Sequence, residues 1–138
     1  MKFIKNDGGR EKDYPKCNLK KHQTGDCVIR AISIALEKPY KEVLVDLCEL
    51  AIKLGYMPNS HEVYREYLKE KGWEETKFGK SMVRINSTKI PKNEWVICYI
   101  RKHLTAIKGN ELHDTWNCSS KTKISNMFRV FRIYTKIK

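Results

Sequence analysis

The chain has 138 residues, of which 41% are hydrophobic, and 28 Lys and Arg against 16 Asp and Glu give it a formal net charge of +12. This length is typical of one domain, and the apolar content is sufficient for a folded core, which excludes a disordered or low-complexity chain. No apolar run approaches the ~18 residues of a membrane-spanning helix, so no membrane partner is predicted. We expect a single domain over residues 1–138.

Cysteine usage favours a reducing compartment. The five cysteines are odd in number, form no Cys-x-x-Cys pair, and include Cys48 and Cys98 within apolar segments. These features are typical of free thiols rather than of a disulfide framework. The residues after Ile4 are polar, so no apolar stretch of a secretory signal is present. The sequence therefore predicts a cytoplasmic location.

The first half of the chain is predicted to be helical. Residues 1–22 have little periodicity and are expected to be an irregular initial segment. Apolar residues at helical spacing then predict a helix over 28–36, opened by residues 24–27, a second over about 40–54, and a third over about 60–71. Asp26 immediately precedes the first helix, where a carboxylate can accept the free N–H groups of the first turn.

The second half has the patterns of strands. Residues 95–100 form a continuous apolar run of strand length, and residues 103–108 and 111–116 flank Gly109-Asn110, a typical hairpin turn. Further strands are predicted at residues 73–78, 82–85 and 128–137. Helices followed by an antiparallel sheet indicate an α+β fold.

Cys27 is the first candidate for a functional residue. It lies at the predicted start of a helix, where free N–H groups and the helix dipole stabilise a thiolate and lower the pKa of a thiol. The thiolate is the nucleophilic form of cysteine, so this position suits covalent catalysis. A small buried core residue is the alternative interpretation.

The predicted hairpin places a base and a carboxylate on one face. If Gly109-Asn110 is a two-residue loop, residue 108 pairs with 111, and His103 and Asp114 become diagonal neighbours on the same face of the two strands. Asp114 can then orient the imidazole of His103, which is the base that a nucleophilic cysteine needs. A register shifted by one residue would move Asp114 to the other face, and Asn117 would be the substitute.

Two further residues complete the predicted site. Gln23 precedes Cys27 by four residues, and its side-chain amide can stabilise an oxyanion together with the backbone N–H of Cys27. Trp116 faces His103 in the predicted register, where its ring can shield the pair of charges from water.

These residues resemble the papain-like cysteine peptidase superfamily, and more narrowly its small bacterial and phage domains, including the bacteriocin-processing type. The resemblance spans residues 23–117 and depends on the order and context of Gln23, Cys27 and the segment 103–114. It implies a papain-like α+β domain, with N-terminal helices packed on a C-terminal antiparallel sheet. It also implies Cys27 as nucleophile, His103 as general base and acid, Asp114 as orienting residue and Gln23 as oxyanion donor, with no cofactor.

The predicted function is a cysteine-dependent hydrolase or acyl transferase acting on amide bonds of a protein or peptide. A small basic domain of this type suits a phage or mobile-element protein that acts on a host protein in the host cytoplasm. One alternative is a non-catalytic protein-binding or inhibitor module on the same fold. The other is a nucleic-acid-binding protein that uses the charge of +12.

Neither nucleic acid nor metal is the favoured ligand. Lysine and arginine are scattered along the chain, without an arginine-rich block, which is typical of a solvated surface. His113 with Cys118, and His22 with Cys17 and Cys27, match no standard zinc spacing, so no metal site is predicted.

Overall fold

The computed structural model describes residues 1–16, 25–119 and 129–138, and within them the protein is an α+β domain. Its helices are α1 (Arg10–Asp13), α2 (Cys27–Leu36), α3 (Tyr40–Leu54) and α4 (His61–Glu70). Its strands are β1 (Lys2–Lys5), β2 (Trp73–Lys77), β3 (Val83–Arg84), β4 (Trp95–Ile100), β5 (His103–Lys108), β6 (Glu111–Asp114), β7 (Arg129–Val130) and β8 (Arg132–Lys136). None of the helices in these residues is long and apolar enough to cross a membrane.

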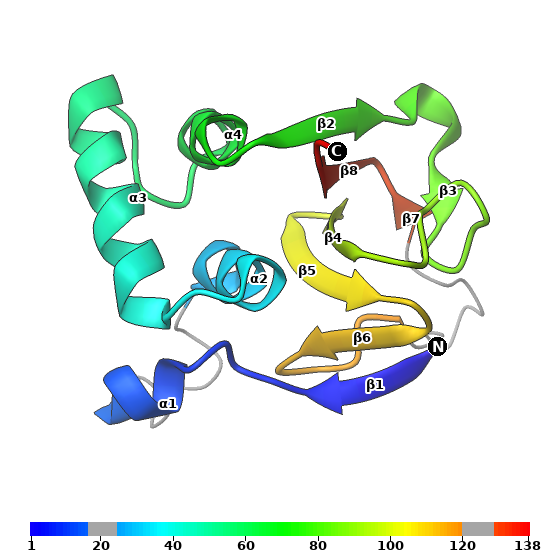
Figure 1. Cartoon of the computed structure of the whole chain (residues 1–138), viewed down its shortest axis with the longest axis horizontal. Coiled ribbons are helices and arrows are strands. Elements are labelled where there is room, and N and C mark those ends of the chain that lie inside the picture. The colour runs from blue at the N-terminus through cyan, green and yellow to red at the C-terminus, as the bar shows by residue number, and fades with distance from the viewer. Residues whose placement is uncertain (17–24, 120–128) are drawn as a thin grey trace.

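The main sheet has six strands in the order β1-β6-β5-β4-β8-β2 (Figure 1). The pairs from β6 to β2 are antiparallel, as the sequence predicts, whereas β1 is parallel to β6. The strands β3 and β7 form a separate two-stranded sheet. The helices α2, α3 and α4 lie together on one side of the main sheet, and α2 lies between α3 and β5 (Figure 1).

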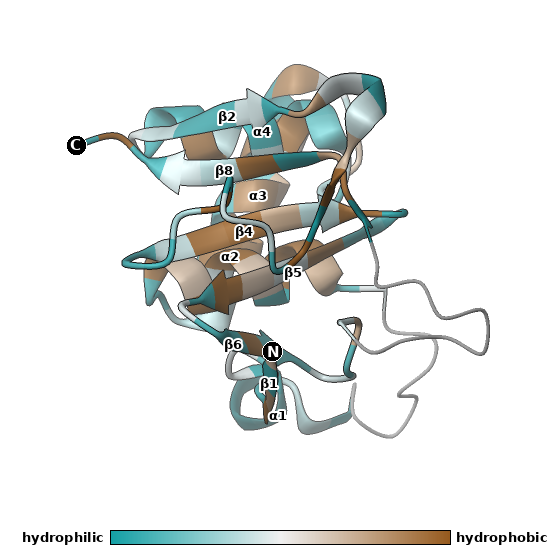
Figure 2. Ribbon diagram, turned by 90° about the vertical axis from the view of Figure 1, so that its right-hand side faces the viewer, coloured by the Kyte–Doolittle hydropathy of each residue, from teal (hydrophilic) through white to brown (hydrophobic). Residues whose placement is uncertain are grey.

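Both faces of the central strands are covered, which explains the unbroken apolar run of β4. Ile97 of β4, with Leu104 and Ala106 of β5, packs into the core beneath the helices. Val96 and Cys98 point into a second core on the opposite face. Alternate residues of a strand point to opposite faces, so a strand buried on both sides has no polar alternation. Figure 2 shows the resulting apolar band along β4 and β5.

The three long helices confirm the helical prediction. α2 and α3 begin and end within a residue or two of the predicted bounds, and α3 stops at Gly55, whose backbone is left-handed (φ 82°). The predicted capping by Asp26 is wrong, because its side chain accepts no hydrogen bond from the backbone N–H groups of the first turn of α2. The Asp26 carboxylate instead forms ion pairs with the buried side chains of Arg10 and Arg30. A charged donor binds a carboxylate more strongly than a neutral backbone N–H does.

Two strand predictions and the irregular initial segment need correction. The sequence predicts an irregular segment over residues 1–22, but β1 and α1 lie within it, and residues 17–22 fall outside the described ranges. β1 forms because Phe3 packs against the second core while its backbone pairs with β6. The strand predicted at 128–137 is divided into β7 and β8, since Phe131 leaves the ladder to bond with Tyr99 and Phe78. The strand predicted at 111–116 ends at Asp114.

Candidate active site

Cys27 is the first residue of α2, as the sequence predicts. The N–H groups at the start of a helix have no partner within the helix and form a region of positive potential. The thiol lies partly exposed in this region, while the rest of α2 from Val28 to Ala35 is buried against the sheet and α3. The candidate nucleophile thus lies partly exposed at the end of a buried helix.

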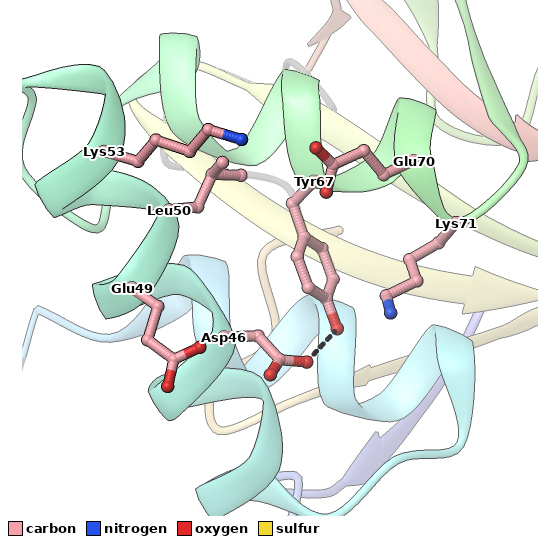
Figure 3. Close-up of a pocket in the computed structure, with 7 residues that line it drawn as sticks. All are labelled: Asp46, Glu49, Leu50, Lys53, Tyr67, Glu70 and Lys71. Atoms are coloured by element: carbon pink, nitrogen blue, oxygen red, sulfur yellow. Dashed lines mark hydrogen bonds between the residues drawn. The ribbon is translucent and has the colours of Figure 1, made fainter.

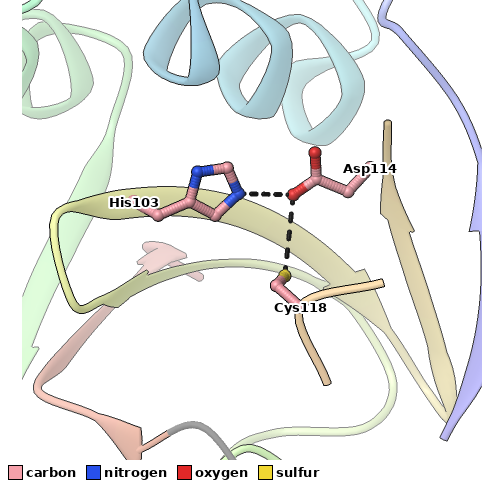
Figure 4. Close-up of side chains that lie close together, drawn as sticks. All are labelled: His103, Asp114 and Cys118. Carbon is pink, nitrogen blue, oxygen red and sulfur yellow. Dashed lines mark hydrogen bonds and ion pairs between the residues drawn. The ribbon is translucent and has the colours of Figure 1, made fainter. Parts of the chain in front are cut away.

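The predicted hairpin register is confirmed. Lys108 pairs with Glu111 and Ala106 with His113, so paired positions sum as expected for a two-residue loop. The Nε2 atom of His103 lies 2.7 Å from Oδ2 of Asp114, a hydrogen bond in which the ring N–H donates (Figure 4). Asp114 is almost fully buried, so this contact has little competition from water.

Cys27 and His103 are brought together by α2 and β5. The Cys27 thiol hydrogen-bonds to the His103 ring and to the backbone of Leu104. Nε2 of the ring is engaged by Asp114, which leaves Nδ1 available to a second partner. Burial raises the pKa of the Cys27 thiol, but these hydrogen bonds and the charges of His103 and Arg30 outweigh it and bring that pKa below its ordinary value.

The pKa of His103 moves in the opposite direction. Burial lowers it, but hydrogen bonds to Asp114, Cys118 and Cys27 together raise the pKa of the imidazole well above its ordinary value. Burial also raises the pKa of Asp114, and the bond and charge of His103 reverse this and hold the pKa of the carboxyl below its ordinary value. A lowered thiol pKa beside a raised imidazole pKa favours a thiolate–imidazolium pair.

The remaining predicted residues have different positions. Trp116 lies against His103, with ring centroids 5.1 Å apart, and covers the ring on one side while remaining 45% exposed. Asn117 does not replace Asp114, since its side-chain oxygen accepts hydrogen bonds from the N–H and hydroxyl of Ser119. Gln23, the predicted oxyanion donor, lies outside the described residues.

Arg30 belongs to no motif in the sequence, although it joins the two halves of the site. This buried arginine donates from Nη1 to Asp26, and its Nη2 lies 3.3 Å from Oδ1 of Asp114. Asp26 also binds Arg10 at 2.9 Å and accepts the hydroxyl of Tyr40 at 2.7 Å. The network ties the start of α2, where Cys27 lies, to the end of β6, where Asp114 lies.

Cys118 is the second residue of the site that sequence reasoning missed. Its buried sulfur lies 3.7 Å from Oδ2 of Asp114 (Figure 4). His103, Asp114 and Cys118 each have one atom of a type that binds metals, and these three atoms lie within 4.8 Å of one another. Such a group could hold a metal ion. The fit to a cation is poor, because the imidazole nitrogen already contacts the carboxylate and Arg30 adds positive charge on its other oxygen.

A hollow of about 300 Å³ opens beside Cys27 and His103. It is lined by residues from α2, α4, β4, β5, β8 and the adjoining turns: Cys27, Val28, Asn59, His61, Tyr64, Tyr99, Lys102, His103, Leu104 and Arg132. The thiol therefore faces a space in which part of a substrate can be bound. This space has an aromatic and cationic wall.

A second hollow lies between α3 and α4 (Figure 3). Its lining is mainly charged, with carboxylates and lysines of both helices around Tyr67, which donates to Asp46 at 3.2 Å. No thiol of the described residues lines it, so it is not a candidate for thiol chemistry.

Comparisons of the chain with protein-family models, with curated proteins and with solved structures give no match. A function for this chain is therefore inferred from the chemistry of the site itself.

Proposed function

We propose that this protein is a cysteine-dependent hydrolase or acyl transferase of papain-like fold, acting on an amide bond of a protein or peptide. The observation that carries the proposal is the grouping of Cys27, His103 and Asp114, in which the imidazole lies beside the Cys27 thiol in one hollow and donates to the Asp114 carboxylate. Nucleophile, base and orienting carboxylate within hydrogen-bond reach are the signature of nucleophilic acyl transfer.

The first half of the proposed reaction forms an acyl-enzyme. The Cys27 thiolate attacks the carbonyl carbon, and the backbone N–H groups at the start of α2 stabilise the oxyanion that develops. The imidazolium of His103 then donates its proton to the leaving amine as the C–N bond breaks. Asp114 keeps the ring oriented and stabilises its positive charge throughout.

The second half regenerates the thiolate. Neutral His103 takes a proton from water, the resulting hydroxide attacks the thioester, and the C–S bond breaks to release a carboxylic acid. An amine in place of water gives acyl transfer by the same steps. Trp116 limits access of water to the hydrogen bond between His103 and Asp114, which supports its strength.

Hydrolysis can be detected in a mixture that offers many peptides at once. A complex peptide mixture is incubated with the protein in water enriched in oxygen-18, and products are identified by mass spectrometry. We expect heavy oxygen in new C-terminal carboxylates if a peptide bond is cut, or in new glutamate side chains if glutamine is deamidated. Because Cys27 forms the covalent intermediate, Cys27→Ala should lower product formation by at least about a thousandfold.

Cys48→Ala is the matched control, since it removes another partly exposed thiol, on α3, outside the hollow. Its products and rates should equal those of the wild type. Labelled products that persist unchanged in Cys27→Ala would contradict the proposed function.

A further inference from the structure

The hollow beside Cys27 carries two cationic side chains that the proposed reaction does not use. Lys102 directly precedes His103 in the chain and is exposed, and among the described residues it has no ion-pair partner. Arg132 of β8 also lines the hollow and is partly buried. Both side chains are therefore placed to contact a substrate bound next to the thiol.

Arg132 is held in a fixed orientation. Its Nη2 donates to the hydroxyl of Tyr64 at 2.7 Å, and its Nε donates to the hydroxyl of Tyr134 at 2.8 Å. The guanidinium carbon lies 3.8 Å from the centre of the Tyr99 ring. A guanidinium has more N–H donors than these two bonds use, and its planar form matches a carboxylate. Since the side chain is already ordered, little entropy is lost when it binds an anion.

The described residues that line the hollow include two cationic side chains, Lys102 and Arg132, and no carboxylate. Glu75 lies 3.6 Å from Nε of Arg132, but Arg65 also pairs with Glu75, at 2.9 Å. The pKa of His61, which lines the hollow, responds to the charges around it. Burial lowers its pKa, and the charges of Arg132 and Arg65 lower that pKa by more than Glu75 and Glu62 raise it. The exposed ammonium of Lys102 adds to this positive potential.

We propose that the hollow selects peptide or protein substrates with an acidic side chain, aspartate or glutamate, next to the bond that Cys27 attacks. Arg132 binds the carboxylate through its unused N–H groups, and Lys102 closes over it from the exposed side. The rings of Tyr64 and Tyr99 contact the aliphatic part of that side chain. This inference rests on the proposed function and names the substrate class of the same site.

The test uses two peptidyl acyloxymethyl ketones that differ only in the residue bearing the ketone, glutamate in one and glutamine in the other. The Cys27 thiolate displaces the carboxylate leaving group and forms a thioether, whose rate of formation is followed by intact-protein mass spectrometry at low salt. A charge-assisted hydrogen bond favours the glutamate probe, so we expect it to react about tenfold faster with the wild type.

Variants assign this preference to the two cations. The ratio of the glutamate rate to the glutamine rate should fall by at least about threefold in each of two variants. Lys102→Gln is an exposed substitution that should not disturb folding. Arg132→Lys keeps the charge but loses the planar guanidinium group. Lys53→Gln removes the same charge from the other hollow, between α3 and α4, and should keep the wild-type ratio. Labelling with neutral iodoacetamide establishes in each variant that Cys27 is still reactive.

Equal rates for the two probes in the wild type, with rapid iodoacetamide labelling of Cys27, would overturn this inference and leave the proposed function intact. A preference that survives unchanged in both variants would overturn the assignment to Lys102 and Arg132. Slow iodoacetamide labelling of wild-type Cys27 would overturn the proposed function, and this inference with it.

Discussion

Replacing His103 with alanine should slow alkylation of Cys27 by iodoacetamide about tenfold at about pH 6. The thiolate is the reacting form, and a thiol with an ordinary pKa of about 8.5 is only roughly 0.3% ionised at that pH. In the wild type, the hydrogen bond and charge of His103 lower the pKa of the Cys27 thiol. Without them, burial of the sulfur raises that pKa and suppresses the thiolate further.

The rates are measured by quenched labelling and peptide mapping, with His61→Ala as the matched control. His61 places another imidazole in the same hollow, but its ring contacts Tyr64 and Glu75 rather than the thiol. We expect its removal to change the rate by less than about twofold. An equal loss of reactivity in both variants would show that the effect is not specific to His103.

The second large effect concerns stability and the buried network behind the site. Replacing Asp26 with asparagine should lower the free energy of unfolding by about 3 kcal/mol. The substitution keeps the shape of the side chain but removes the negative charge that lies between Arg10 and Arg30. Both arginines are buried, so the lost charge is not replaced by water. Breaking a buried ion pair from one side costs more than the pair itself contributes.

Chemical unfolding followed by circular dichroism measures this change, and Glu42→Gln provides the control. Glu42 forms an exposed ion pair with Lys38 at 3.5 Å, which should contribute less than about 0.5 kcal/mol. If the two variants were equally stable, the network of Arg10, Asp26 and Arg30 would not hold α2 in place. Asp26→Asn should also slow alkylation of Cys27. Arg30 pairs with both Asp26 and Asp114, so a change at Asp26 disturbs the carboxylate that orients His103.

The local parts of the fold and of the site could be predicted from the sequence. Helical spacing and Gly55 determine the extent of α3, and the Gly109-Asn110 turn determines the register that brings His103 to Asp114. These features depend on interactions between residues close in the chain, for which spacing and turn chemistry are sufficient. Cys27 could be placed at the start of α2 for the same reason.

The parts that failed depend on partners far away in the chain. β1 has four residues and forms only because β6 supplies a parallel neighbour more than a hundred positions later. Asp26 has the sequence features of an N-cap, and its true partners, Arg10 and Arg30, become visible only in three dimensions. Arg30 is a charged residue within the apolar run of α2, which indicates that it is buried and paired. Its partners cannot be identified from the sequence. Arg132, near the end of the chain, has no such signal.

The pH dependence of Cys27 alkylation in the wild-type protein tests the central claim most directly. The pKa of Cys27 is lowered and that of His103 is raised, so the ion pair persists between the two values. The rate should therefore reach its plateau at a lower pH than that of an ordinary thiol, whose pKa is about 8.5, and should fall as acid protonates the thiolate. Cys98, whose thiol pKa is raised by burial, should remain unlabelled in the same samples. If the Cys27 rate instead rises through about pH 8.5 like that of an ordinary thiol, Cys27 and His103 do not form a catalytic pair.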